Sequence, residues 1–419
     1  MISAALLAGC GGERGADTTT EPAAFTVRDS GGVRVAMSTD SSWTVERAWT
    51  VAARPSLEIG RGAGAEFGRV VGTVRLGDGR IAVADAQTLD IRVFGADGGL
   101  LERFGGRGAG PGEFRRLDNL ALIRGDSLVG RNDGLFRHEI YAADGSYGRT
   151  VTAPPAGVLF APVVGWLEDG TFVVGPTHPR GALLEPGRQE LLAEWHVFDA
   201  AGTDSGVLAS LPERLVDGRD VGGLVIPAVV SYSPWTKAAT DATGVWFGFA
   251  STYELRHFGA GGLDLIVRRS WQAEAVTPEL REHYRAWLDR GVRRSDVDEV
   301  FGLELVTRLR QAAMLEARGA APPPLAFADS LPAFVRAIVA RDGHLWVEAH
   351  ATLDELLGGS PGDVATRRWS VFDPEGCWLG TVRTPAGLRV TEIGGDYLLG
   401  VAVDSLDVES VRLYAIVKP

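Results

Sequence analysis

Ile91-Arg-Val-Phe-Gly-Ala-Asp-Gly98 decides the fold, because this short phrase of an apolar strand and a tight turn ending in Gly recurs along the chain. Repetition of one small unit is typical of propellers and solenoids, in which each unit buries its apolar face against the next. A sixth copy, Val411-Arg-Leu-Tyr414, has the strand without the turn. The other complete copies cover residues 138–145, 195–202, 255–262 and 369–376.

A second phrase accompanies each copy, and its clearest example is Gly77-Asp-Gly-Arg-Ile-Ala-Val-Ala-Asp85. An Asp-Gly pair between apolar runs favours a tight hairpin turn, because Gly adopts positive φ without steric cost. With one strand before each of these turns and a further strand after each of the first five Phe or Tyr strands, every unit has four antiparallel strands. The sequence therefore predicts an all-β fold, a six-bladed β-propeller of four-stranded antiparallel blades. The second phrase covers residues 77–85, 125–130, 169–174, 243–248, 342–347 and 394–399.

The last blade lacks a fourth strand of its own. Residues 57–67 nearly duplicate residues 101–114, which contain the outer strand of the first blade and its link to the second. We therefore predict that residues 55–60 supply the missing strand, so that the N-terminal segment closes the ring and removes an exposed sheet edge. Residues 25–38 are expected to form an extra hairpin packed outside. The six blades are predicted at 70–104, 117–151, 163–211, 236–271, 333–383 and 388–417.

Three of these motifs carry a family resemblance. Gly108-Ala-Gly-Pro-Gly-Glu-Phe114, Val83-Ala-Asp85 and Ile91-Arg-Val-Phe94 resemble the repeats of NHL-type six-bladed propellers. Residues 25–419 as a whole resemble a family of bacterial lipoproteins called 6-bladed beta-propeller proteins. The resemblance implies the fold. It implies little about function, because such propellers include carbohydrate-, protein- and RNA-binding members and a few enzymes.

The N-terminus carries a localisation signal. Leu7-Ala-Gly-Cys10 matches the bacterial lipobox, in which the thiol of Cys10 is acylated, and residues 11–24 are polar enough to be a flexible tether. We expect residues 1–10 to be a lipoprotein signal segment and residues 25–419 to be the propeller. Gly after the Cys resembles the outer-membrane sorting signal, so we expect a lipid-anchored protein of the cell envelope. The apolar stretch before Cys10 is short and has no basic region, and the alternative is a chance match.

Composition excludes two kinds of partner or anchor. The formal net charge is −12, and no cluster of five or more basic residues occurs, which argues against nucleic-acid binding. No run of 18 or more apolar residues occurs, so we expect no membrane-spanning helix. With Cys10 acylated, Cys377 has no disulfide partner and is expected to be a packing residue. We expect a monomer.

The predicted strand order separates two faces of the disc. The tight turns between strands one and two, and three and four, lie on one face, here called the turn face. The long segments lie on the other, here called the loop face, and insertions gathered on one face usually mark the binding face of a repeat fold. These long segments are residues 178–192, 212–235, 272–332 and 351–367, with Gly-rich links at 60–68 and 105–114.

The largest insertion, between the fourth and fifth blades, is predicted to be helical over residues 277–318. Thr277-Pro-Glu begins a first helix with an N-cap and a Pro in the first turn, and an apolar stripe follows at helical spacing. Residues 295–298 begin a second helix with a pattern like a capping box. The pair is either a lid across the loop face or a cover for the gap between two blades.

Catalytic and metal motifs give weak signals. The sequence has no recognised metalloprotease, nucleophile-elbow or phosphate-loop motif, and we expect no cofactor. His344, Glu348 and His350 share one face of a strand, but His344 and His350 stand roughly 20 Å apart, too far for one ion. Asp85 and Asp90 flank a short loop and are expected to cap it rather than to catalyse.

The strongest candidate for a ligand site is a set of cations near the starts of the innermost strands, on the loop face. They surround the mouth of the central channel in an otherwise acidic protein, so the mouth could take a carboxylated or sulfated ligand such as an acidic glycan. The alternative is ordinary pairing of these cations with neighbouring carboxylates. The cations are Arg69, Arg116, Lys237 and Arg389, and their expected neighbours are Arg131, Asp133, His178, Trp235, Tyr253 and His350.

Two function classes follow. The first is a cell-envelope lipoprotein whose propeller binds a glycan, peptide or protein on the loop face without catalysis. The second is a hydrolase, lactonase or lyase with an active site at the channel mouth. It would need acids and bases on the innermost strands, where the sequence offers few besides Asp118 and Glu392. The scarcity of such groups favours the binding module.

Overall fold

The recurrent Asp-Gly and Gly-ended turns form tight hairpins in the computed structural model of the chain. Gly79 has φ of 91° and Gly98 has φ of 82°, a conformation that Gly adopts without strain. Each closes its turn by donating a backbone hydrogen bond, from Gly79 N to Leu76 O at 3.0 Å and from Gly98 N to Gly95 O at 2.9 Å. The structure describes residues 24–419 except 62–65, 153–161, 179–183, 291–306, 309–311, 314, 317–318, 320–323, 359–366, 405 and 407.

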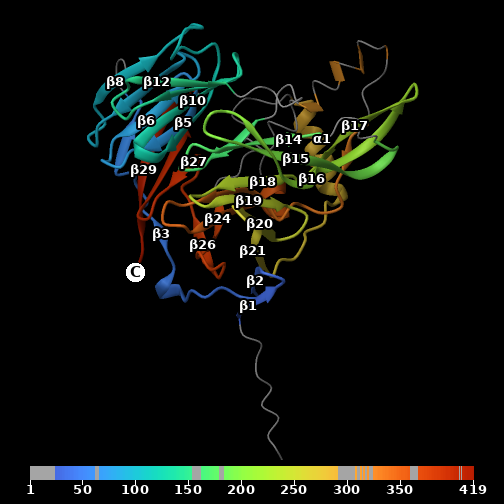
Figure 1. Ribbon diagram of the computed structural model, residues 1–419. Helices are drawn as coiled ribbons and strands as arrows, with labels where there is room; N and C mark the ends of the chain where they lie inside the picture. The colour runs from blue at the N-terminus through green and yellow to red at the C-terminus, as the bar shows by residue number, and fades with distance from the viewer. Residues whose placement is uncertain are drawn as a thin grey trace, which may run out of the picture.

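The described strands form six sheets, each named here by its innermost strand, and strands that follow one another within each repeat pair in antiparallel fashion (Figure 1). The first three sheets contain β5 (Val70–Arg75), β6 (Ile81–Asp85), β7 (Asp90–Phe94) and β8 (Leu100–Gly105); β9 (Leu117–Ile123), β10 (Ser127–Asn132), β11 (Arg137–Tyr141) and β12 (Tyr147–Thr152); and β13 (Val163–Trp166), β14 (Phe172–Thr177), β15 (Gly187–Phe198), β16 (Asp204–Val221), β17 (Leu224–Ser231) and β22 (Ala326–Phe327).

The remaining three sheets share the same antiparallel core of four strands. They contain β18 (Thr236–Thr240), β19 (Gly244–Phe249), β20 (Glu254–Gly259) and β21 (Gly262–Arg269), with β2 (Val33–Ser38) and β1 (Phe25–Ser30) at the outer edge; β23 (Phe334–Val339), β24 (Leu345–Ala349), β25 (Arg368–Phe372) and β26 (Trp378–Arg383); and β27 (Leu388–Ile393), β28 (Tyr397–Val403) and β29 (Glu409–Val417), with β3 (Thr50–Val51) and β4 (Leu57–Ile59).

The innermost strands contact one another in a closed cycle. β5 contacts β9, β9 contacts β13, β13 contacts β18, β18 contacts β23, β23 contacts β27, and β27 contacts β5 again. Sheets arranged radially about such a cycle make a β-propeller. Each innermost strand runs from the loop face to the turn face, so its last residues lie beside the tight turns.

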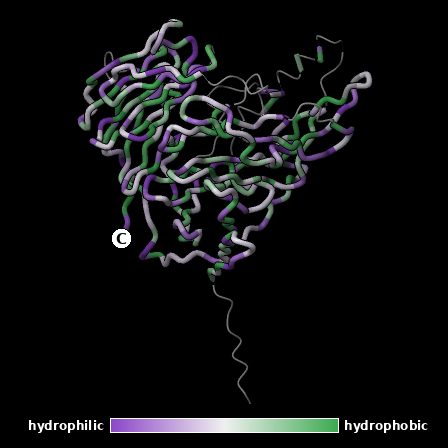
Figure 2. Tube along the Cα trace, viewed as in Figure 1, coloured by the Kyte–Doolittle hydropathy of each residue, from purple (hydrophilic) through white to green (hydrophobic). Residues whose placement is uncertain are grey.

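The core lies between neighbouring sheets. Phe114, which is fully buried, packs with Ile91 and Tyr141 in a cluster that joins the β5 and β9 sheets. Phe94 and Leu399 play the same part between the β5 and β27 sheets. β6 and β7 are buried along their whole lengths, because neighbouring sheets cover both of their faces, and hydrophobic residues run through all the sheets in the hydropathy-coloured trace (Figure 2).

The N-terminal segment adds strands to two sheets. β4 pairs antiparallel with β29, with Ile59 opposite Val411, which is the pairing that the duplicated sequence predicts. The predicted outer hairpin is also present: β1 pairs with β2, and β2 adds to β21 in parallel. Between them the chain crosses β26, where Trp43 N donates to Leu379 O at 2.8 Å. Residues 25–59 therefore contact three sheets.

One predicted loop is wrong. Residues 212–235 contain the end of β16 and all of β17, which pair with each other from Val216 opposite Val229 to Val221 opposite Leu224. Gly222 and Gly223, both with positive φ, make the turn between them. The apolar run after this Gly-Gly pair is a hairpin signal that the sequence analysis did not use. β15 also begins inside the predicted loop 178–192, part of which lies outside the described residues.

The first predicted helix is α1 (Pro278–Asp289). Leu280 N donates to the side-chain oxygen of Thr277 at 3.3 Å, so Thr277 is the N-cap. Leu280, Tyr284 and Trp287 are buried in a cluster with residues of β17, β22 and the short helix α3 (Leu353–Gly358), which the sequence analysis did not predict. Most of the second predicted helix, 295–318, lies outside the described residues. Among the described helices, none has the length and apolarity to cross a bilayer.

Candidate functional site

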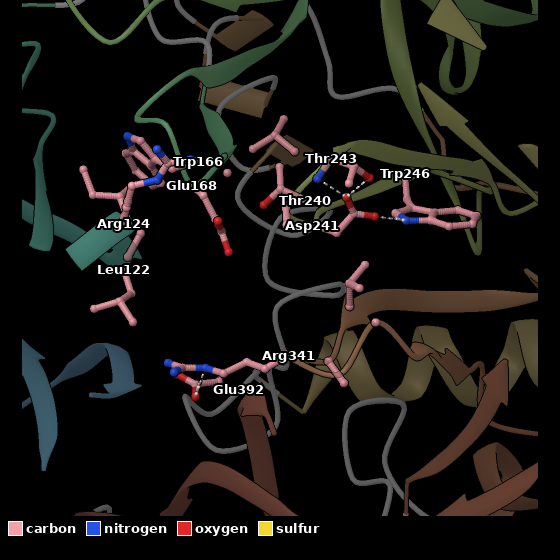
Figure 3. Close-up of a pocket in the computed structure, with 18 of the residues that line it drawn as sticks. Leu122, Arg124, Trp166, Glu168, Thr240, Asp241, Thr243, Trp246, Arg341 and Glu392 are labelled. Atoms are coloured by element: carbon pink, nitrogen blue, oxygen red, sulfur yellow. Dashed lines mark hydrogen bonds and ion pairs between the residues drawn. The ribbon is translucent and has the colours of Figure 1, made fainter. Parts of the chain in front are cut away.

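A cavity of about 1140 Å³ lies where the innermost strands end at the turn face (Figure 3). Its lining comes from the last residues of these strands and from the hairpin turns that follow them, so widely separated parts of the chain meet there. This volume is slightly above the usual range of small-molecule sites, which is about 300–1,000 Å³. Each of the six sheets supplies at least one lining residue from its innermost strand: Thr73, Asn119, Trp166, Thr240, Val339 and Thr391.

One wall carries an ion pair between an exposed arginine and a half-buried glutamate. Arg341 Nε lies 2.9 Å from Glu392 Oε1, Arg75 N donates to Glu392 Oε2 at 3.0 Å, and Tyr397 OH also donates to Glu392. Burial raises the pKa of Glu392 above its ordinary value, although Arg341 and the hydrogen bonds act in the opposite direction. Three groups of the protein hold this carboxyl group, so Glu392 is a fixed part of the wall.

Two threonine hydroxyls join neighbouring sheets at the same wall. Thr73 on β5 and Thr391 on β27 are 2.5 Å apart between their Oγ1 atoms, and Thr391 Oγ1 donates to Leu399 O at 3.1 Å. Because the hydroxyl of Thr391 donates its one hydrogen bond to Leu399 O, the hydroxyl of Thr73 is the donor between the two threonines. The residues are separated by 318 positions in the sequence.

The opposite wall holds a histidine between two carboxylates. His257 Nδ1 lies 2.7 Å from Asp264 Oδ1 and His257 Nε2 lies 3.3 Å from Asp241 Oδ2. Trp246 Nε1 donates to Asp241 at 2.7 Å, as Figure 3 shows. Burial disfavours the charged imidazole, but the hydrogen bonds to both carboxylates outweigh it and raise the pKa of His257. Similarly, burial is outweighed at Asp241, whose pKa is lowered by its hydrogen bonds to His257 and Thr243.

Two further charged side chains line the cavity without such partners. The backbone N of Arg124 donates to Glu168 O at 3.0 Å, which fixes the turns of the β9 and β13 sheets side by side. Both side chains are exposed, and neither makes an ion pair or hydrogen bond with a described residue. Gly125, with φ of 72°, shapes the turn after Arg124. Figure 3 shows Arg124 and Glu168 on one side of the cavity, with Arg341 and Glu392 across from them.

Three of the predicted ligand residues meet at the loop-face end of β9. Arg116 Nε lies 2.6 Å from Asp118 Oδ1, Arg131 Nε lies 2.5 Å from Asp133 Oδ1, and Arg116 Nη2 lies 3.8 Å from Asp133 Oδ2. Burial, with the nearby charge of Asp133, raises the pKa of Asp118. These two cations are balanced by two carboxylates, which is the alternative that the sequence analysis left open.

A second group contains His178, Trp235 and Lys237. His178 Nε2 lies 2.8 Å from Glu213 Oε2, and Arg214 Nη1 lies 2.7 Å from Glu213 Oε1. Arg214 lies over the ring of Trp235 at 4.8 Å, and Lys237 Nζ lies 6.0 Å from the same ring. The structure therefore brings these three predicted residues together around Glu213 and Arg214.

Arg69 and Arg389 lie on either side of Val70. Arg389 Nη2 donates to Val70 O at 2.8 Å, and Arg69 N donates to Asp85 Oδ1 at 3.0 Å. Asp85 also accepts from the backbone N of Gly68 at 3.0 Å, so it caps the link between two sheets. It accepts from the backbone N of Gln87 at 2.9 Å as well, in the short loop that it was expected to cap.

The last two predicted residues are buried in packing positions. Tyr253 is 4% exposed, packs against Phe334 with ring centroids 5.5 Å apart, and lies under Arg269 at 4.1 Å. His350 is 8% exposed, and its Nδ1 is 2.8 Å from Ala351 O.

None of the ten predicted residues lines the described cavity at the turn face. The ligand role of the loop-face residues stays a prediction, and part of the loop face lies outside the described residues. Sequence reasoning missed the cavity because its lining is assembled from residues of all six repeats, which lie far apart in the sequence. Threonines at the ends of three innermost strands, Thr73, Thr240 and Thr391, are the signal that was available.

The two histidines considered as metal ligands, His344 and His350, flank β24. Glu348, which lies between them in the sequence, forms ion pairs with two cations, Arg336 Nη2 at 2.8 Å and Arg367 Nη1 at 2.5 Å. Within the described part of the chain, no group of three or more His, Cys, Asp or Glu residues has the geometry to hold a metal ion.

The chain matches no protein-family model and no curated protein sequence. Its structure is similar to that of a candidate exported protein of Bacteroides fragilis, with a TM-score of 0.48 and 10% identity over 91% of this chain and 98% of that one. It is also similar to a DUF4221 family member from Bacteroides vulgatus (TM-score 0.48, 9% identity, 89% and 99% covered) and to a gluconolactonase from Xanthomonas campestris (TM-score 0.39, 13% identity, 89% and 97% covered). Likenesses this distant assign neither a family nor an activity to the chain.

Proposed function

We propose that this protein is a binding module that takes its ligand in the cavity at the turn face, without catalysing a reaction. One observation carries the proposal: side chains from all six sheets converge on a single cavity of about 1140 Å³. Concave sites with a few convergent polar groups are the usual places for ligands in a propeller or barrel.

The hydrogen bonding of His257 and Glu392 supports binding over catalysis by either of these groups. A general base needs a lone pair or carboxylate that is available to the substrate. His257 is held by Asp241 and Asp264, and Glu392 is held by Arg341 and two other donors. These groups are already engaged in the protein's own hydrogen bonds.

We propose further that the six sheets are the blades of a six-bladed propeller, with the segment around α1 as a helical insertion between the fourth and fifth blades. The cycle of contacts among β5, β9, β13, β18, β23 and β27 supports the blade count. The pairing of β4 with β29 supports closure of the ring by the N-terminal segment.

The binding test uses a glycan array probed with the full chain, followed by two single substitutions placed at the two faces. Asn119→Trp adds a large ring to the cavity at a residue whose side chain has no hydrogen-bond partner among the described residues. Arg116→Ala, three residues earlier, changes the loop face instead. We expect Asn119→Trp to remove binding and Arg116→Ala to leave it. The reverse pattern would place the ligand on the loop face, as the sequence analysis predicts, and would contradict the cavity proposal.

The proposed location is the cell envelope, with the chain anchored in the outer membrane by a lipid on Cys10 and acting as a monomer. The lipobox sequence Leu7–Cys10 supports it, and residues 1–23 lie outside the described residues. Labelling of expressed protein with a radioactive fatty acid tests the anchor. We expect label in the native chain and none in Cys10→Ala, whereas equal labelling of both would contradict the assignment.

An enzyme remains the second candidate, favoured by one observation. Glu392 is a carboxyl group with a raised pKa beside a guanidinium in a cavity, an arrangement that hydrolases, lactonases and lyases use for proton transfer. Mass spectrometry of array-positive ligands after incubation tests this candidate. A product that forms with the native chain and not with Glu392→Gln would favour the enzyme.

A further inference from the structure

The charges of the cavity divide into those that the protein already balances and those that it does not. Glu392 pairs with Arg341, and His257 pairs with Asp241 and Asp264. Asp126, in the same turn as Arg124, accepts from Gly77 N at 3.0 Å. The charged side chains of the lining that have no ion-pair or hydrogen-bond partner among the described residues are therefore those of Arg124, Glu168 and Arg34, the last of them on β2.

Arg124 and Glu168 are held close by their backbones and yet remain unpaired. The hydrogen bond of 3.0 Å from Arg124 N to Glu168 O fixes the two turns against each other. The two side chains nevertheless make no ion pair with each other, and neither has any other partner among the described residues. An opposite pair at this separation can bind a ligand with both chemistries, an anion for the guanidinium and hydroxyl donors for the carboxylate.

The rest of the lining suits the hydroxyl groups of the same ligand. Thr240 and Asn119 line the cavity with side-chain groups that have no hydrogen-bond partner among the described residues. Thr73 and Thr391 bring two more hydroxyl oxygens. The cavity volume of about 1140 Å³ leaves room for a ligand of several sugar units.

We propose, resting on the proposed binding function, that the ligand is an acidic oligosaccharide of uronic-acid units. Arg124 binds a sugar carboxylate through two parallel hydrogen bonds, as guanidinium does with carboxylates. Glu168 accepts hydrogen bonds from ring hydroxyls beside that carboxylate. Arg34, on the N-terminal hairpin at another side of the cavity, binds a second carboxylate further along the chain. Neither guanidinium group has an ion-pair partner among the described residues, so both are available to the carboxylates of an acidic sugar, whereas a neutral sugar offers them no carboxylate.

Isothermal titration calorimetry of the full chain tests the proposal. The probes are trimers of galacturonate, glucuronate and mannuronate, with neutral galactose and glucose trimers as matched controls. We expect at least one uronate trimer to bind about tenfold or more tightly than its neutral counterpart, and the difference to shrink as NaCl is raised. Equal affinity for acidic and neutral trimers would overturn the ligand class. So would a result in which a neutral trimer binds and no uronate trimer does. Either result would leave the binding function standing.

Substitutions assign the contacts. Arg124→Ala is expected to weaken uronate binding about tenfold or more and neutral binding little, and Arg124→Lys to lose part of it, because ammonium lacks the planar fork. Glu168→Gln keeps the shape and is expected to weaken acidic and neutral trimers alike. Both residues are exposed and unpartnered, so we expect thermal melting to be unchanged. Unaltered uronate affinity in Arg124→Ala would contradict the contact, whereas failure of every trimer, together with no effect of Asn119→Trp on any array ligand, would contradict the binding function itself.

Discussion

A single buried histidine, His138 on β11, sets one pH response of the fold. Its side chain is 3% exposed, its ring packs against Trp166 and Phe172 at 5.3 and 5.0 Å, and neither ring nitrogen has a hydrogen-bond partner among the described residues. Burial, with the charge of Arg131, lowers the pKa of His138 to about 3. The neutral ring is therefore the form that fits between the β9 and β13 sheets.

Because the pKa of His138 in the folded chain lies below the ordinary 6.5, its stabilising effect is complete above pH 6.5 and is lost as the pH falls toward 3. We expect the native chain to lose up to about 1.4 kcal/mol per pH unit over this window in excess of a His138→Phe variant. Urea unfolding at pH 7.5, 6, 5 and 4 measures the difference. Parallel loss of stability in both chains would show that His138 does not titrate as a buried neutral group.

His257 gives a pH response of opposite sign. Its folded pKa is raised, so its ion pairs with Asp241 and Asp264 are present below pH 6.5 and are lost as the pH rises through the folded value. We expect Asp264→Asn to lower the pKa of His257, because one of the two carboxylates that stabilise the imidazolium is gone. An NMR titration of the His257 ring in the native chain and in the variant checks this. An unchanged midpoint would exclude the 2.7 Å contact with Asp264 as a cause of the raised pKa.

Among the structural elements, β4 carries the connection between the two ends of the chain. Ile59 is 3% exposed and packs with Phe67, Phe94 and Val411 in the cluster between the β27 and β5 sheets. Glu58 on the same strand lies 2.9 Å from Arg412. The three residues of β4, near the N-terminal end of the described chain, thus pair with β29, its last strand.

Ile59→Ala is expected to lower the free energy of unfolding by about 2–5 kcal/mol, because it leaves a cavity in this cluster. If β4 completes the ring, the loss will appear in one cooperative unfolding transition of the whole molecule. Val27→Ala on the exposed strand β1, where the side chain is 50% exposed, is the matched control and is expected to change stability by less than about 0.5 kcal/mol. A local transition near the N-terminus in Ile59→Ala, with the rest unchanged, would contradict a closing role for β4.

For the whole molecule, the sequence predicts the repeat but not the cavity. The turn phrases locate most strands because a hairpin signal is local: Asp-Gly at 78–79 specifies its turn whatever the rest of the chain does. The duplication of 101–114 at 57–67 likewise predicts the pairing of β4 with β29. The hairpin of β16 and β17 was not predicted, because residues 212–235 were assigned as a long loop between two repeats.

The cavity could not be predicted, because its contacts join residues that are distant in sequence. Thr73 meets Thr391, and Arg124 N meets Glu168 O, only after the sheets are arranged about one axis. The predicted loop-face cations were visible in the sequence, whereas the pairing of Arg116 with Asp118 and of Arg131 with Asp133 depends on side-chain placement. Local patterns therefore predict the blades, and tertiary packing decides which face offers unbalanced groups.

The most direct test of the central claim is a crystal structure of the full chain grown with the tightest-binding uronate trimer. The cavity account predicts the sugar at the turn-face end of the channel, with one carboxylate on Arg124 and hydroxyls on Glu168. A trimer bound instead on the loop face, beside Arg116 or Trp235, would contradict it and return the ligand site to the rim that the sequence first indicated.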